Sequence, residues 1–178
     1  MVAKNVLKAD TQVAQAIQNN STTATVEDKT NYVVSINQTD GRELVETLGY
    51  KLLTTALMYK LFIPYLKDLA EQGNAEAQAT LNEMINTKAE WLEDLILNKN
   101  KVKIGTAERD IVLPQQDGRF DRADMNDFGY PEKLTDNGGF YYWSPAGNKR
   151  AVIRDWDSVL VLNLNRTPSN VNDYLGIV

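Results

Sequence analysis

Apolar residues recur every three or four positions through the middle of the chain, a spacing typical of one buried helical stripe. The series is Leu44, Leu48, Leu52, Ala56, Tyr59, Ile63 and Leu66. Asp40 is a good N-cap residue, and Glu43 follows it at the position of a capping box. We therefore predict a helix from about residue 40 to residue 71. It should bend around Tyr59 and Lys60, because Pro64 cannot donate a helical hydrogen bond.

This helix is apolar on more than one side. Between residues 52 and 66 the flanking positions also carry apolar side chains, namely Leu53, Leu57, Met58, Leu61 and Phe62. A helix that is hydrophobic around most of its circumference is normally buried. We therefore expect several neighbouring elements to cover it.

A second helical pattern begins after a tight turn. Gly73 suits a helix C-terminus, Asn74 suits an N-cap, and Glu76 suits the positive end of the next helix dipole. The apolar stripe of this second helix contains Leu81, Met84 or Ile85, Lys88, Trp91 or Leu92, and Leu95. Helices joined by so short a turn run antiparallel. Residues 40–100 are thus predicted to form a long helical hairpin.

Beyond residue 100 the pattern changes to alternation, which indicates β-strands. The strand-like runs cover residues 101–105, 109–114, 139–143, 151–156 and 159–164. A Ser-Pro-Ala-Gly-Asn turn predicts that the third and fourth runs form a hairpin. Residues 115–138 should form a loop with one helical turn near 122–126. Residues 26–36 fit a helix or a strand equally well.

Together these patterns predict a single α+β domain. It has a long antiparallel helical hairpin with short flanking helices, followed by a small antiparallel β region and extended terminal arms. The expected divisions are an N-terminal arm over 1–39, the hairpin over 40–100, the β region over 101–166 and a C-terminal tail over 167–178. A length of 178 residues suits one hydrophobic core.

Composition removes several kinds of chemistry. The chain has no cysteine and no histidine. This excludes disulfides, thiolate zinc sites, cysteine nucleophiles and the commonest general base near neutral pH. We expect no catalytic activity and no cofactor. The net charge of −5 lacks the basic face that tight sequence-specific nucleic-acid binding requires. An acidic wall is nevertheless compatible with proximity to packaged DNA, because it repels phosphate.

Two groups of acidic residues are better explained by structure than by chemistry. Residues 117–127 hold several aspartates, but Gly118 directly follows the first of them and no glutamate closes the loop, unlike in an EF-hand. Turn-forming and capping aspartates are therefore favoured over a metal site. Glu90, Glu93 and Asp94 are expected on a solvated helix face and not in an acid–base pair.

The most apolar window, residues 48–66, has the length of a membrane span. It also contains Lys51, Lys60 and Pro64, so a buried helix is expected instead. The first ten residues lack the apolar run of a signal peptide, and synthesis in the cytoplasm is therefore expected.

Aromatic and apolar residues late in the chain form a candidate contact surface. Strand alternation places Phe140 and Tyr142 on one face and Tyr141 and Trp143 on the other. Core packing, a stacking platform for a ligand and a partner surface all remain open for this cluster. The candidate interface residues are Tyr142, Trp143, Trp156, Tyr174, Leu175 and Ile177.

Residues 44–105 resemble the core of the small head-tail connector, or adaptor, proteins of tailed bacteriophages. In the first helix the resemblance lies in the apolar stretch with a tyrosine at residues 52–61, Leu-Leu-Thr-Thr-Ala-Leu-Met-Tyr-Lys-Leu. In the second helix it lies in Ala77, Leu81 and residues 89–95, Ala-Glu-Trp-Leu-Glu-Asp-Leu. Residues 99–105 resemble that family's short basic exit into a strand. The aromatic-rich strands after residue 105 have no counterpart in it, and its longer N-terminal helices are shortened here.

The resemblance implies a virion structural protein without catalytic activity, located in the neck. It would form a homo-oligomeric ring that joins the portal to the tail proteins, held by helix packing between neighbours and by an inserted tail. The apolar stretch from Tyr174 to Val178 suits that insertion. The alternatives are a capsid decoration or tail accessory protein, and a non-viral intracellular binding module. Self-association separates them, since a ring subunit forms high-order closed oligomers.

Overall fold

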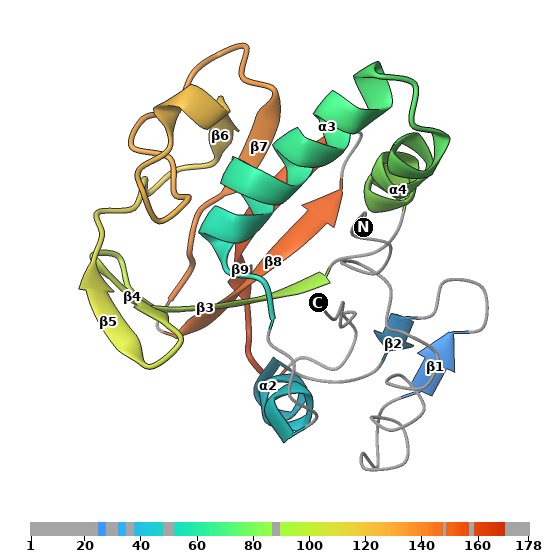
Figure 1. Cartoon of the computed structure of the whole chain (residues 1–178). Coiled ribbons are helices and arrows are strands. Elements are labelled where there is room, and N and C mark those ends of the chain that lie inside the picture. The colour runs from blue at the N-terminus through green and yellow to red at the C-terminus, as the bar shows by residue number, and fades with distance from the viewer. Residues whose placement is uncertain are drawn as a thin grey trace.

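A seven-stranded sheet forms the centre of the fold, and a long helix crosses one of its faces (Figure 1). The computed structural model describes residues 25–27, 32–34, 38–47, 52–86, 90–147, 149–156 and 159–169. The sheet has the strand order β5-β4-β3-β8-β9-β7-β6. Its strands are β3 Glu90–Asn98, β4 Lys101–Ile104, β5 Ala107–Asp110, β6 Gly118–Phe120, β7 Phe140–Trp143, β8 Arg150–Trp156 and β9 Leu160–Arg166.

The helices are short apart from one continuous run. They are α2 Gln38–Thr47, the π-helix η1 Leu57–Phe62, α3 Ile63–Glu71, α4 Ala75–Asn86 and the 3-10 turn η2 Arg122–Asp124. Residues 55 and 56 are also helical, and η1 continues directly into α3. We call residues 55–71 the central helix. Gly73, with a positive φ of 86°, ends it and allows α4 to turn back against α3.

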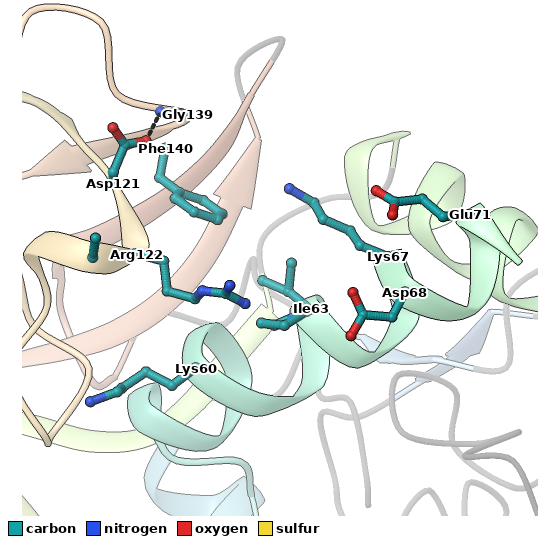
Figure 2. A pocket seen from close by; sticks show the side chains of 11 residues that line it. Lys60, Ile63, Lys67, Asp68, Glu71, Asp121, Arg122, Gly139 and Phe140 are labelled. Atoms are coloured by element: carbon teal, nitrogen blue, oxygen red, sulfur yellow. Dashed lines mark hydrogen bonds between the residues drawn. The ribbon is translucent and has the colours of Figure 1, made fainter.

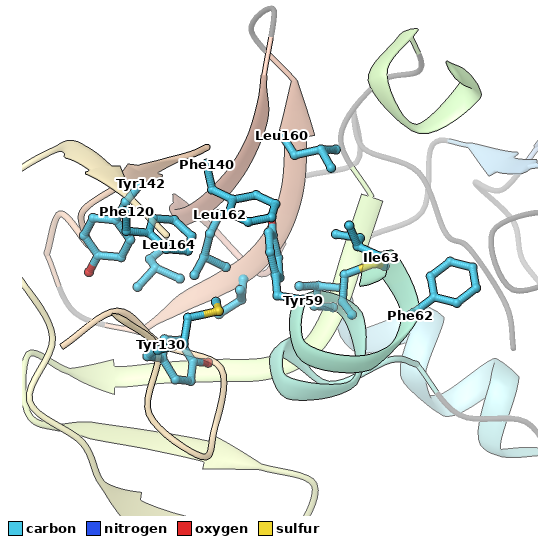
Figure 3. Close-up of a cluster of buried hydrophobic side chains, with 14 of the residues drawn as sticks. Tyr59, Phe62, Ile63, Phe120, Tyr130, Phe140, Tyr142, Leu160, Leu162 and Leu164 are labelled. Carbon is cyan, nitrogen blue, oxygen red and sulfur yellow. The ribbon is translucent and has the colours of Figure 1, made fainter. Parts of the chain in front are cut away.

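The hydrophobic core lies between the central helix and one face of the sheet (Figure 3). Tyr59 is its largest helical member, and its ring meets that of Phe140 edge-on at 5.5 Å between centroids. Phe140 in turn stacks on Phe120 at 5.4 Å. The Tyr59 hydroxyl also donates a hydrogen bond of 2.8 Å to the Val161 carbonyl. A single tyrosine thus joins the helix to both the aromatic cluster and the backbone of β9.

The predicted long helical hairpin is wrong. The predicted first helix is interrupted, because α2 ends at Thr47 and residues 52–54 are not helical. The predicted second helix is α4 as far as Asn86, but Glu90–Asn98 form β3, near the middle of the sheet. Trp91, Leu92 and Ile96 are bulky or β-branched residues that suit a strand, and their burial between layers overrides a helical spacing that fits only loosely.

The predicted hairpin between the runs 139–143 and 151–156 is also wrong. β9 lies between β7 and β8 and pairs parallel with β7 but antiparallel with β8. The β region is therefore a mixed sheet and not a small antiparallel one. Residues 160–164 of β9 are buried at every position, and all of them except Asn163 are apolar, which suits the interior of a sheet.

Two further predictions concern residues 26–36 and the long loop before β7. The undecided run 26–36 contributes strands, β1 Thr25–Glu27 and β2 Tyr32–Val34, which pair antiparallel. In the long loop the predicted helical turn is confirmed as η2. Its Asp121 and Asp124 form a reciprocal capping box, which is a local structural use for two of the clustered aspartates.

Candidate partner-binding surface

The outer face of the central helix carries a row of exposed apolar side chains. Leu57, Leu61 and Tyr65 follow one another at intervals of four residues, so they lie along one line of the helix. Their exposed fractions are 42%, 61% and 45%. We call these three residues the outer stripe. Single exposed apolar residues are normal, but a row of them makes this face a candidate interaction site.

The widened turn of the helix has a local cause in Pro64. A proline in a regular α-helix lacks the donor for the fourth carbonyl before it, and its ring crowds that carbonyl. The helix is a π-helix directly before this proline, and the Ile63 amide donates to the Met58 carbonyl five residues back. The sequence predicted a bend at Tyr59 and Lys60, and the structure places a wider turn at these residues. π-turns of this kind are frequent at functional sites.

A groove of about 700 Å³ runs beside the outer stripe, between the central helix and the segment around η2 (Figure 2). Ile63 and the ring of Phe140 provide its apolar floor. Lys60 and Lys67 reach it from the helix, and Arg122 reaches it from the opposite wall. The groove therefore combines an apolar base with three cationic side chains.

These cations are engaged to different degrees. The Lys60 amine donates to the Asn126 carbonyl at 3.0 Å and pairs with Asp127 at 3.5 Å. The Lys67 amine lies 5.3 Å from the centroid of the Phe140 ring, within the range of a cation–π contact. Among the described residues, the guanidinium of Arg122 forms neither a hydrogen bond nor an ion pair. Of the three, Arg122 is the one best placed to accept an outside anion.

Acidic side chains line the same groove. Asp68 and Glu71 lie on the helix wall, and Asp121 lies on the other. The Asp121 carboxylate accepts a hydrogen bond of 2.8 Å from the Gly139 amide, which satisfies one of its oxygens. The formal charges in the groove therefore balance. This argues against a free multivalent anion and for a partner that brings both an acid and apolar groups.

The start of the central helix is fixed by a buried carboxylate on β3. Asp94 Oδ2 accepts hydrogen bonds from the Tyr130 hydroxyl at 2.7 Å and from the Thr55 amide at 3.3 Å. The Thr55 hydroxyl completes the triangle by donating to the Tyr130 oxygen at 3.3 Å. Gly129 lets the loop approach, because a Cβ there would lie 2.6 Å from the Ala56 nitrogen. The helix that carries the outer stripe is thus held rigidly at its first turn.

Burial raises the pKa of Asp94 to about 6, although the hydrogen bonds from Thr55 and Tyr130 lower it in part. Its second oxygen, Oδ1, has no hydrogen-bond partner within the described part of the chain. The expectation that Glu93 and Asp94 lie on a solvated helix face is therefore wrong. Both are buried because residue 90 onward is a strand in the sheet interior, and Glu93 pairs with Arg42 at 2.8 Å.

The candidate interface residues from the sequence lie in three kinds of position. Tyr142 is fully buried, and its hydroxyl donates to the Pro114 carbonyl at 3.0 Å, so its ring belongs to the core and not to a surface. Trp143, at the end of β7, is half-buried. Trp156 ends β8, but its side chain lies outside the described residues. Tyr174, Leu175 and Ile177 also lie outside them.

The outer stripe and Arg122 were not among those candidates. A signal was nevertheless present, because Leu57 and Leu61 widen the apolar arc of the helix beyond one stripe. The expectation from the sequence was that other elements of the chain cover this excess. The structure covers one side of the helix with the sheet and leaves the opposite side exposed.

Comparisons of the chain with protein-family models, with curated proteins and with solved structures gave no match. In the described residues, no helix has the length and apolar character needed to cross a membrane. No group of three or more metal-ligating side chains is gathered in the described ranges.

Proposed function

We propose that this protein is a non-catalytic component of a larger protein assembly and that the outer face of the central helix is its contact surface. The observation that carries the proposal is the outer stripe, Leu57, Leu61 and Tyr65. Three large apolar side chains in a row on a fixed helix lose contact with water only when a partner covers them. A helix face with anchors four residues apart is a recurrent recognition element in protein complexes.

The surroundings of the stripe support a protein partner over a small molecule. The adjoining groove has charged residues of both signs along its walls. Small-molecule sites are normally concave and mainly apolar, and they enclose most of the ligand. An apolar row bordered by mixed charges instead has the pattern of a protein interface, with a hydrophobic centre and a polar rim.

The more specific proposal is that the assembly is the neck of a tailed bacteriophage, where the protein would join the portal to the tail as a ring. The part of the resemblance that supports it is residues 52–61, of which 55–61 begin the central helix and include Leu57 and Leu61 of the outer stripe. Residues 89–95 give it no support, because the structure describes Glu90–Asn98 as strand β3.

Sedimentation velocity of the full chain over a range of concentrations, alone and mixed with a phage portal protein, tests this function. We expect self-association or portal binding, and we expect Leu61→Asp to weaken it about tenfold or more, because a charge would be buried at the centre of the contact. Val112→Asp is the matched control. Val112 is 77% exposed but follows β5 and is not part of the central helix.

Two results would contradict the proposal. One is a chain that stays monomeric at all concentrations and does not bind the portal. The other is an association that Leu61→Asp and Val112→Asp weaken equally, since the outer stripe would then have no special part in it. Association without portal binding would support the assembly role and remove the neck-specific version.

A further inference from the structure

The chain that follows β5 forms a strand-like edge beside the sheet. β5 is a terminal strand in the sheet order (Figure 1), and the chain continues past it through residues 111–114. The Ile111 amide donates to the Asn100 carbonyl at 2.9 Å. The Leu113 amide donates to the Lys99 carbonyl at 3.1 Å. Donation by alternate residues toward one side is the pattern of an extended strand, so this segment prolongs the pairing of the sheet along its inner edge.

Val112 lies between these two residues and has the opposite surroundings. Its side chain is 77% exposed, whereas Ile111 and Leu113 are 4% and 2% exposed. Within the described ranges, neither the amide nor the carbonyl of Val112 forms a hydrogen bond. In a strand, the N–H and C=O of one residue point to one edge, and those of the next residue point to the other. Val112 therefore presents a donor, an acceptor and an apolar side chain at the outer edge.

The neighbouring edges of the sheet are protected, unlike the edge at Val112. β5 carries three consecutive exposed charged residues, 108–110, and exposed charge is a common means of preventing pairing at an edge. At the other end of the sheet Arg119 in β6 bridges to Thr135, so a loop covers that edge. Val112 follows the charged strand but has no charge of its own. An uncharged, uncovered edge position is where another chain can add as a strand.

A trough runs along this edge. Two adjoining cavities of about 590 and 380 Å³ share Val112 and Glu132 as lining residues, so Val112 lies at the middle of the trough. The segment 110–116 forms one wall, and residues of the loop 125–134 form the other. We call this the edge trough. Its two joined cavities and its unpaired backbone groups fit a short extended peptide better than a compact ligand.

The charges along the edge trough are mainly negative. Its lining residues in the described chain include three acids, Asp110, Asp127 and Glu132, and one base, Lys133. The Lys133 amine pairs with Asp124, which is not a lining residue, at 3.0 Å. The edge trough therefore favours a cationic ligand.

The three acids are available to such a ligand. The Asp110 and Asp127 carboxylates pair with lysines at 3.8 and 3.5 Å, but both side chains are more than 90% exposed, and exposed pairs of this kind are weak. Among the described residues the Glu132 carboxylate forms neither a hydrogen bond nor an ion pair. No three acids in these ranges gather closely enough to hold a metal ion. Their separation instead suits cationic side chains spaced along a peptide.

We propose that the edge trough binds an extended segment of another protein that alternates apolar residues with lysine or arginine. The segment adds to the sheet as a strand and forms backbone hydrogen bonds with the amide and carbonyl of Val112. Its apolar side chains contact Ile111, Met125 and Phe128, which line the trough, and its cationic side chains meet the three acids. This inference goes beyond the proposed assembly function and does not rest on it, because no residue of the outer stripe lines the edge trough.

Fluorescence anisotropy of a labelled peptide with the full chain tests this binding. The probe is Val-Lys-Val-Lys-Val-Lys-Val with blocked ends, and the control peptide has glutamate in place of each lysine. We expect the cationic peptide to bind at least about tenfold more tightly, and we expect this preference to shrink at high salt because it comes from exposed charges. Equal affinity for the two peptides, or binding of neither, would overturn the proposal.

Val112→Pro tests the backbone pairing. Proline removes the amide donor, and this amide forms no hydrogen bond within the described chain, so the fold should be retained. We expect the affinity for the cationic peptide to fall about tenfold, with an unchanged circular dichroism spectrum. Unchanged affinity in the folded variant would show that the peptide does not pair with this edge, and the proposal would be wrong.

The charge contribution is tested without any change to the backbone. Asp127→Asn combined with Glu132→Gln alters two exposed side chains and should remove most of the preference for the cationic peptide. A preference that survives intact in this double variant would overturn the assignment of a cationic ligand.

Leu61→Asp on the outer stripe is the control and should bind the cationic peptide as the wild type does. A loss from Leu61→Asp equal to that from Val112→Pro would place the peptide on the central helix and overturn the proposal. Val112→Asp remains the control for association through the outer stripe, since Val112 lies outside that surface. Failure of self-association and portal binding would remove the proposed function without affecting the peptide measurement.

Discussion

The inner and outer faces of the central helix are built from the same kinds of residue but have opposite surroundings. On the inner face Met58, Tyr59 and Ile63 are almost completely buried against the sheet. On the outer face Leu57, which directly precedes Met58, and Leu61, which lies two residues before Ile63, are exposed. The difference is in what lies opposite each face, and not in hydrophobicity. Burial on the inner face stabilises the monomer, whereas the outer face can contribute free energy only through a partner.

The comparison teaches that an apolar helix position has two different uses. A position packed against strands contributes to the free energy of unfolding, and its loss leaves a cavity. An exposed position of equal hydrophobicity contributes almost nothing to folding and remains available for contact with a partner. Measurements of stability and of association should therefore respond to different residues of one helix.

The largest expected effect is on the inner face. Leu66→Ala should lower the free energy of unfolding by about 2–5 kcal/mol, because Leu66 is 1% exposed and its removal leaves a cavity in the core. Leu61→Ala on the outer face should change it by less than about 0.5 kcal/mol. Urea denaturation followed by circular dichroism measures both. Equal losses at the two positions would remove the distinction between the faces.

The next effect is the pH dependence of stability that comes from Asp94, the buried carboxylate hydrogen-bonded to the first turn of the central helix. The pKa of Asp94 is about 6 in the folded chain, against an ordinary value of 3.8. The folded state therefore holds the proton more tightly than the unfolded state does. The contribution of Asp94 to the free energy of unfolding is fully present below about pH 4. It decreases as the pH rises through about 6 and is lost above that. A difference of about two pKa units corresponds to about 3 kcal/mol.

Asp94→Asn isolates this contribution from that of other acids. The unfolding free energy of the wild type minus that of the variant should fall by about 3 kcal/mol between pH 4 and pH 7. Asp68→Asn, which changes an exposed carboxylate of the central helix, is the control for the loss of a carboxylate as such. Parallel pH profiles for the wild type and Asp94→Asn would show that Asp94 does not hold its proton in the folded state.

The smallest effect tests one hydrogen bond on the inner face. Tyr59→Phe removes the hydroxyl that donates to the Val161 carbonyl and should cost about 1 kcal/mol, while the ring contacts with Phe140 remain. Tyr65→Phe is the matched change on the outer face, where Tyr65 is 45% exposed, and should leave stability unchanged. Thermal unfolding at one pH compares the two. A larger loss from Tyr65→Phe would reverse the assignment of the faces.

Local patterns predicted several elements of the fold but not their arrangement. The helical turn near residue 122, and strands near 101–104, 140–143, 151–156 and 160–164, follow from turn residues and alternation in the sequence. The apolar residues between Trp91 and Asn98 fit a spacing of three or four, which predicts a helix. A short, mostly apolar run fits either period, and only its pairing with β4 and β8 decides for a strand.

The candidate surface was predictable only in part. The excess of apolar residues on the central helix was visible in the sequence, as was the apolar run at 174–178. Sequence alone could not show that Tyr142 is in the core, because alternation in β7 assigns residues to two faces without saying which face is covered. Nor could it place Arg122 opposite Lys67, since these residues come from elements far apart in the chain.

What the sequence determined by itself is local: where Pro64 disturbs a helix, where Gly73 ends it, and which positions are apolar enough to need cover. These properties depend on a few neighbouring residues, whose backbone geometry and side-chain spacing are the same in any fold. The tertiary structure decided which apolar positions receive that cover. Burial depends on elements distant in sequence, and the sheet lies against only one face of the helix, so Met58 became core while Leu61 stayed exposed.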